Sequence, residues 1–110
     1  MVSLGTITFT GISGKNYKFS VYHFGTAFKA LGAVYFITHR QNLSDHSYDH
    51  TRIYVGQTKG LSERFDNHYK YSCFLTNNAN CICIHLDDSE KSRLEKEKDL
   101  YDKYHPTCNY

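Results

Sequence analysis

Residues 32–38 constrain the fold most, because they form an almost wholly apolar run with the sequence Gly-Ala-Val-Tyr-Phe-Ile-Thr. A strand with apolar side chains on both faces has to be covered by other elements on both sides. Two further short strands are predicted at 52–56 and 81–86, where apolar residues again cluster. The sequence therefore predicts three core strands that lie between covering layers.

Two helices are predicted to flank these strands, over residues 61–72 and 90–104. The first has apolar and aromatic side chains at helical spacing: Leu61, Phe65 and Tyr69. In the second, Ser89 or Ser92 is the expected N-cap. Pro106 prevents this helix from continuing, because proline lacks the backbone N–H that a helix interior needs.

Polar and turn-forming segments separate these elements. Residues 6–10 and 17–22 alternate apolar and polar side chains across a glycine-containing turn, which predicts a β-hairpin. Residues 24–31 are expected to form a short helical turn. The polar segment 39–51 is predicted to be an exposed loop.

The predicted fold class is α/β (α+β), with a small, mostly antiparallel central sheet of three core strands flanked by helices. The chain has 110 residues, which suits one domain with one modest core. Residues 1–31 are assigned to an extra N-terminal β-hairpin, and residues 32–110 to the core of the domain.

Composition permits several partners. The formal net charge is only +2, which allows nucleic acid as a partner but does not indicate it. No apolar run approaches the roughly 18 residues that a membrane helix needs, and no basic segment followed by an apolar one begins the chain. We therefore expect a cytoplasmic protein that does not associate with a membrane.

Four cysteines leave two alternatives to ordinary packing, a pair of disulfides or a metal site: Cys73, Cys81, Cys83 and Cys108. Disulfides are not expected, because the chain shows no export signal. Cys81 and Cys83 are closer together than the cysteines of common zinc sites. On a strand they would share a face with His85, but buried packing is the favoured interpretation.

Glu97 is predicted to face the interior of the last helix, because it falls on the same stripe as Leu94, Tyr101 and Tyr104. A carboxylate in that position needs a cation, hydrogen-bond donors or a metal ion. The alternative is that Arg93 pairs with Glu97 one turn away and that both stay in solvent.

Arg64 and His68 are four residues apart and would share one face of the first helix. In a cleft, Arg64 would bind a phosphate, and His68 would donate to it or take a proton. The alternative is a solvated flank. Tyr35 and Tyr54 are likewise expected as packing residues if each is considered alone.

Taken in order, these residues resemble the GIY-YIG nuclease superfamily. Residues 33–35 (Ala-Val-Tyr) match the first motif and residues 54–56 (Tyr-Val-Gly) the second. Arg64 lies ten residues after Tyr54, where the family places its catalytic arginine. The segment 97–109 is similar to the closing signature, with Glu97 first and Asn109 last.

The resemblance implies a divalent-metal-dependent endonuclease that hydrolyses phosphodiester bonds in DNA with one Mg²⁺ or Mn²⁺ ion. Glu97 would bind the ion, together with water and substrate oxygens. Arg64 would neutralise the phosphate, and Asn109 would fix the geometry around Glu97.

The resemblance leaves the general base open among Tyr35, Tyr54 and His68, each of which would orient or deprotonate the attacking water. Contacts to substrate phosphates are expected from the following residues: Gly56, Lys59 and Lys70. A chain of this size contacts few base pairs, so a second copy or a partner protein would be needed for sequence specificity.

A nucleic-acid-binding or adaptor module without turnover is the alternative function. It is motivated by Ala33, which stands where the family has glycine, and by the low net charge. The long segment 39–51 between the two tyrosine motifs is a further departure from the family pattern.

Overall fold

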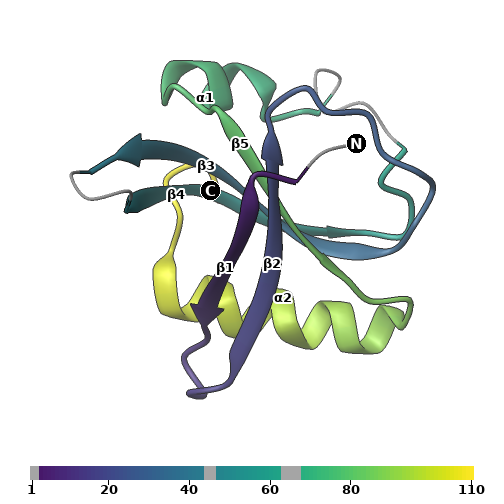
Figure 1. Cartoon of the computed structure of the whole chain (residues 1–110). Helices are drawn as coiled ribbons and strands as arrows, with labels where there is room; N and C mark the ends of the chain where they lie inside the picture. The colour runs from purple at the N-terminus through teal and green to yellow at the C-terminus, as the bar shows by residue number, and fades with distance from the viewer. Residues whose placement is uncertain (1–2, 44–46, 63–67) are drawn as a thin grey trace.

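A computed structural model describes residues 3–43, 47–62 and 68–110 (Figure 1). In these residues the elements are β1 (Gly5–Thr10), β2 (Asn16–His23), β3 (Ala33–Asn42), β4 (Tyr48–Thr58), α1 (Tyr71–Thr76), β5 (Cys81–Leu86) and α2 (Glu90–Tyr104). The strands form one curled antiparallel sheet in the order β1-β2-β5-β3-β4.

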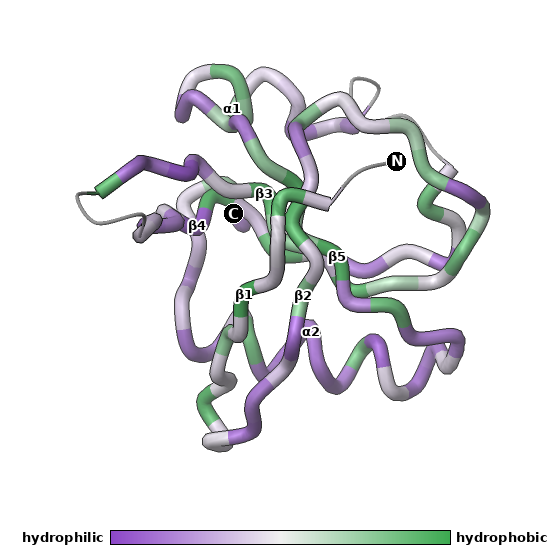
Figure 2. Tube along the Cα trace, viewed as in Figure 1, coloured by the Kyte–Doolittle hydropathy of each residue, from purple (hydrophilic) through white to green (hydrophobic). Residues whose placement is uncertain are grey.

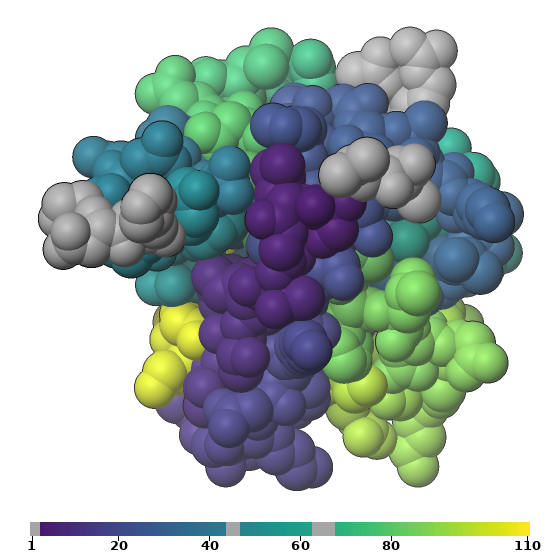
Figure 3. Space-filling view, in the orientation of Figure 1, coloured from purple at the N-terminus to yellow at the C-terminus, as the bar shows by residue number. Residues whose placement is uncertain are grey.

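The predicted core of three strands is wrong, because the sheet contains five. The N-terminal hairpin is not an addition to a finished sheet: β2 pairs with β5, with Ser20 opposite Ile84 and His23 opposite Cys81. β3 pairs with one edge of β5, and β2 pairs with the backbone groups on its other edge. In the space-filling view, β1 and β2 run down the middle of one face of the molecule (Figure 3).

The prediction that residues 32–38 form a strand covered on both sides is confirmed. Residues 33–38 are all buried, and their side chains alternate between two apolar clusters. Tyr35 belongs to a cluster that includes Phe74 of α1, whereas Phe36 belongs to one that includes Leu100 of α2. The two helices lie on opposite sides of the sheet (Figure 1), and hydropathy is highest where β3 and β5 cross its middle (Figure 2).

The helix predicted over residues 61–72 is wrong. Leu61 and Ser62 lie in a turn, residues 63–67 are outside the described part of the chain, and α1 begins only at Tyr71. The helical spacing of these side chains does not reflect one buried stripe, because Leu61 is 2% exposed and Tyr69 is 79% exposed.

Two expected irregular segments also differ. Most of the predicted loop at 39–51 is strand, because β3 and β4 continue to pair as far as Asn42 opposite Tyr48. Asn80 supports this extension by accepting from the Arg40 backbone N–H and donating to the Arg40 carbonyl, at 2.6 and 3.0 Å. Residues 24–25 form a turn, and residues 26–31 are irregular rather than helical.

The last helix has the predicted bounds. The Ser89 hydroxyl accepts from the Ser92 backbone N–H, so Ser89 is the N-cap, and the chain leaves α2 through His105 at φ 43°. Leu94 was wrongly placed inward, because it is 45% exposed while Leu100 is fully buried. Within the described residues, neither helix has the length and apolar character to cross a bilayer.

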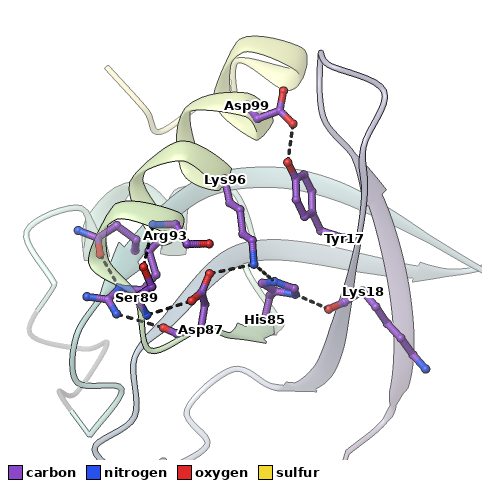
Figure 4. A network of polar contacts seen from close by, with 10 residues as sticks. Tyr17, Lys18, His85, Asp87, Ser89, Arg93, Lys96 and Asp99 are labelled. Carbon is purple, nitrogen blue, oxygen red and sulfur yellow. Dashed lines mark hydrogen bonds and ion pairs between the residues drawn. The ribbon is translucent and has the colours of Figure 1, made fainter.

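Asp99 of α2 joins the helix to the tip of the hairpin. Its carboxylate accepts from the backbone N–H and the hydroxyl of Ser13, at 2.9 and 2.7 Å. It also accepts from the Tyr17 hydroxyl at 2.7 Å (Figure 4). Burial raises the pKa of Asp99, but these donors outweigh burial and the pKa lies below its ordinary value. The pKa of Tyr17 is raised to about 12, first by burial and then by Asp99.

Replacing this acceptor should loosen the hairpin. We expect Asp99→Asn to lower the free energy of unfolding by about 1–2 kcal/mol, because hydrogen bonds to a charged acceptor contribute at about this level. Chemical denaturation followed by circular dichroism measures the change. Asp102→Asn is the matched control, because Asp102 pairs with exposed Lys98 at the surface, and it should change stability little.

The same contact sets a pH dependence. Tyr17 holds its proton more tightly in the folded state, so its contribution is complete below pH 10 and is lost as the pH rises toward about 12. The difference in stability between wild type and Tyr17→Phe should shrink over that range. A constant difference would contradict the assigned Tyr17–Asp99 hydrogen bond.

Candidate functional site

Two tyrosines meet above a glycine where β3 pairs with β4. Tyr35 lies directly opposite Gly56, and the rings of Tyr35 and Tyr54 are 6.1 Å apart. A Cβ on Gly56 would come within 2.7 Å of the Tyr35 hydroxyl and within 2.8 Å of Tyr54 Cε2. The second motif therefore needs glycine here, because the two rings occupy the space of a side chain.

His68 completes this cluster. Its Nε2 lies 3.0 Å from the Tyr35 hydroxyl oxygen, and its ring is 5.0 Å from that of Tyr54. The backbone N–H of Lys70 donates to His68 Nδ1 at 3.1 Å. Because Nδ1 accepts, the neutral imidazole carries its proton on Nε2 and donates it to the Tyr35 oxygen.

Tyr54 has a raised pKa. Burial is the main cause, followed by its hydroxyl contact with Tyr69 at 3.3 Å and by the nearby charges of Tyr35, Tyr69 and Glu97. All of these effects favour the protonated phenol. Tyr54 is therefore a hydrogen-bond donor at neutral pH rather than a base.

Glu97, on α2, lies within electrostatic range of Tyr54 in this cluster. Its side chain is half-buried, and burial raises its pKa, against which the backbone N–H of Gln57 stabilises the charged form. Its charge is close enough to Tyr54 to raise the pKa of that phenol. The predicted inward orientation of Glu97 thus agrees with its position.

The alternative pairing of Arg93 with Glu97 is not formed among the described residues. Arg93 is instead buried at 4% exposure, donating to Gln57 Oε1 at 3.0 Å and to the Asp87 carbonyl at 3.1 Å. Glu97 therefore keeps its carboxylate directed to the edge of β4, where Gln57 lies.

Asn109 holds the outer edge of β4. Its Oδ1 accepts from the Val55 N–H at 2.8 Å, and its Nδ2 donates to the Val55 carbonyl at 2.9 Å. The Cys108 N–H donates to the Ile53 carbonyl at 2.8 Å. Asn109 thus fixes the strand between Tyr54 and Gly56, as a positioning residue rather than one that faces a substrate.

The residues expected to contact phosphate differ in their exposure. Arg64 lies outside the described residues, and Lys59 is exposed. Lys70 is only 8% exposed, donates from Nζ to the Tyr110 carbonyl at 2.9 Å, and lies 3.3 Å from the Tyr110 ring centroid. Lys70 is therefore occupied by the C-terminal segment in this arrangement.

The expectation of no disulfide is wrong, because Cys73 of α1 is bonded to Cys108. Cys81 and Cys83 are free and buried, as packing predicted, and burial raises the pKa of the Cys83 thiol to about 12. Within the described residues, no group of three or more histidine, cysteine or acidic side chains is arranged for a metal ion.

His85 does not join Cys81 and Cys83 in a metal site. Its Nδ1 donates to the Lys18 carbonyl at 2.8 Å, and its Nε2 accepts from Lys96 Nζ at 2.9 Å (Figure 4). Lys96 also pairs with Asp87 at 2.8 Å. Both ring nitrogens of His85 are therefore engaged in contacts that join β2 and β5 to α2.

Tyr69 and Gln57 are neighbours of the site that sequence reasoning missed. Tyr69 was assigned to the buried stripe of a helix, whereas its hydroxyl contacts Tyr54 from an exposed position. Gln57 follows Gly56 directly. Its contacts with Arg93 and Glu97 exist only because α2 lies against β4, so the sequence alone does not indicate them. Adjacency to His68 was the one local clue to Tyr69.

Comparisons of the chain with known protein families, with curated proteins and with solved structures give no match. The likeness to the GIY-YIG superfamily therefore depends on the ordered motifs in the sequence. The geometry of the site is an independent observation, because spacing along the chain does not determine which side chains meet.

Gly56→Ala should destabilise the protein, because the added methyl group meets both tyrosine rings. We expect a loss of about 1–3 kcal/mol, the usual cost of overpacking a core. Chemical denaturation measures it. Gly60→Ala is the matched control, since a Cβ at Gly60 meets nothing within 4 Å. Equal effects of the two changes would contradict the packing of Tyr35 and Tyr54 over Gly56.

Loss of the Cys73–Cys108 bond should also reduce stability. The bond closes a segment with a sequence separation of 35, and Cys73→Ser should cost about 3–4 kcal/mol through the freed unfolded chain. Thermal unfolding with and without dithiothreitol tests this. The reductant should lower the melting temperature of the wild type but not that of Cys73→Ser. A wild type insensitive to reductant would contradict the disulfide.

Proposed function

We propose that this chain is a divalent-metal-dependent endonuclease of the GIY-YIG superfamily that acts on DNA. The observation that carries the proposal is the meeting of Tyr35, Tyr54 and His68 over Gly56, with the charge of Glu97 reaching Tyr54. These side chains come from β3, β4, the segment before α1, and α2. Packing alone requires neither a half-buried carboxylate nor a histidine at that point.

The carboxylate of Glu97 suits a hard cation. Glu97 is a desolvated carboxylate, and a bound cation would compensate the charge that burial disfavours. It is a single carboxylate, which suits Mg²⁺ or Mn²⁺, since Mg²⁺ keeps several water ligands. The ion would stabilise negative charge on the phosphate and on the departing 3′ oxygen.

Tyr35 is the proposed base or water-orienting group. Its oxygen accepts from His68 Nε2–H, and a donor at that position stabilises negative charge on the phenol oxygen. Tyr54 remains protonated and donates a hydrogen bond to the reacting phosphate or water. His68 thereby acts through Tyr35 instead of contacting the substrate.

Arg64 is proposed to neutralise the phosphate, on the resemblance alone. It precedes His68 by four residues, and His68 is in the cluster. Lys59 remains available at the surface for a flanking phosphate, whereas Lys70 would first have to leave Tyr110.

Nucleic-acid binding without turnover is the second candidate. The observation that favours it is that Glu97 and Asn109 both stabilise outward-facing backbone groups of β4, at Gln57 and Val55. That role gives each residue a structural reason to be present without catalysis. Salt-sensitive binding with no cleavage would identify this case.

A nicking assay tests catalysis. Purified protein with supercoiled plasmid and Mg²⁺ or Mn²⁺ should convert the plasmid to the open circular form, and EDTA should prevent this. Glu97→Gln should lower the rate by about 10²-fold or more, because the cation loses its carboxylate. Glu95→Gln is the matched control on an exposed part of the same helix and should retain activity.

The tyrosines provide a second test in the same assay. Tyr35→Phe should reduce the rate by about 10²–10⁴-fold, the range for a general acid or base. Tyr71→Phe removes a hydroxyl from a residue packed against the same apolar cluster and should not. Full activity of Glu97→Gln or Tyr35→Phe, or no nicking of any DNA form by the wild type, would contradict the catalytic proposal.

A further inference from the structure

A groove of about 350 Å³ opens beside the tyrosine cluster, between β2, β5 and the segment 28–31. Its walls are largely apolar and aromatic, formed mainly by Tyr22, Phe28, Leu31, Leu61, Ile84 and Leu86. Leu31 and Leu86 line the groove with 46% and 59% of their surfaces exposed. Apolar surface left in water in this way favours a ligand that covers it.

The groove also has a positive rim. Lys18 on β2 and Lys29 in the segment between β2 and β3 are both exposed, and both line the groove. Among the described residues that line the groove, none is acidic. The ligand that fits is therefore anionic, with an apolar or aromatic part.

Two aromatic rings in the groove's lining pack against each other. Tyr22 and Phe28 pack edge to face, with centroids 5.2 Å apart and an interplanar angle of 84°. Proteins that bind single-stranded nucleic acid combine aromatic side chains, on which bases stack, with a basic groove that follows the backbone. The lining of this groove has both components.

The register of the sheet places the groove next to the tyrosine cluster. Ser20 on β2 lies opposite Ile84 on β5, Ile84 opposite Tyr35 on β3, and Tyr35 opposite Gly56 on β4. Neighbouring strands are about 4.8 Å apart, so Ser20 and Ile84 lie roughly 5–10 Å from Tyr35 along this row. Ile84 also belongs to the same apolar cluster as Tyr35.

The size of the groove restricts its occupant. Its volume is near the lower end of the range of roughly 300–1,000 Å³ for small-molecule sites. That space admits a base that has left the stack, not a paired duplex. Because Ile84 lines the groove and lies opposite Tyr35, a nucleotide bound there would lie next to the tyrosine cluster.

We propose that this groove binds an unpaired nucleotide next to the scissile phosphate, with the base against Tyr22 and Phe28 and the backbone against Lys18 and Lys29. The inference rests on the proposed nuclease function and names its substrate class. The preferred substrate is single-stranded DNA or DNA with an unpaired segment, such as a flap or branch, in preference to continuous duplex.

Binding without metal tests the proposal independently of cleavage. Fluorescence anisotropy in EDTA would compare a labelled oligothymidine with a blunt duplex of equal length, and the single strand should bind more tightly. The double variant Lys18→Ala/Lys29→Ala should flatten the slope of log affinity against log salt by about 1.4, or about 0.7 for each lost phosphate contact. Phe28→Leu should weaken oligothymidine binding about tenfold through lost stacking.

The matched control is Lys91→Ala/Lys103→Ala, which removes two exposed lysines of α2 on the other side of the sheet. This variant should bind oligothymidine with the salt slope of the wild type. Circular dichroism would show that each variant is folded. The lysine variants keep the test decisive if Phe28→Leu is unstable, since Lys18 and Lys29 are exposed.

Three results would overturn the inference. The wild type could fail to bind oligothymidine, the α2 control could lose as much affinity as the groove variants, or both groove variants could bind oligothymidine as tightly as the wild type. The catalytic proposal fails separately. Groove-dependent binding without any nicking would retain the groove and reject catalysis. Nicking by a protein whose groove variants bind oligothymidine normally would retain catalysis and reject the groove.

Discussion

The pairing of β3 with β4 determines where the two tyrosines and the glycine of the candidate site meet. In this register Tyr35 is opposite Gly56, and a slip of one residue would move Tyr35 to the face that α2 covers. A register shift between Ile37 and Thr38 follows immediately, so Ile53 and Tyr54 both join the cluster around Tyr35 although they are consecutive. The bulge and the glycine together let two bulky rings share one small area of the sheet.

Local chemistry explains which elements could be predicted. The bounds of α2 follow from a serine before its first turn and a proline after its end, and β3 follows from an apolar run that only a doubly covered strand tolerates. Strand order is a different matter, because the edge of β5 that receives β2 is chosen by contacts distant in the sequence. The segment 39–51 is predicted as a loop for a related reason. Its strands are held by cross-strand hydrogen bonds and by Asn80, and no local sequence pattern shows these contacts.

The site divides in the same way. The motifs at residues 33–35 and 54–56 predicted two tyrosines on adjacent strands, and the helical stripe predicted a carboxylate that faces inward. Spacing could not show that Lys70 is occupied by Tyr110, because that contact depends on the path of the C-terminal segment. It also could not show that Cys73 and Cys108 meet, since their pairing requires α1 and that segment to converge on β4.

The C-terminal segment has one more effect, on how copies of this chain can associate. Val55 and Ile53 lie on an edge strand, and unpaired backbone groups on the free side of such a strand would recruit a strand from another molecule. Asn109 and Cys108 already bond to backbone groups of Val55 and Ile53, so this part of β4 is closed to strand addition. In the described sheet, β1 is the other edge. Two copies that extend the sheet by pairing along β1 would join through their N-terminal hairpins. The tyrosine clusters would then lie away from that interface.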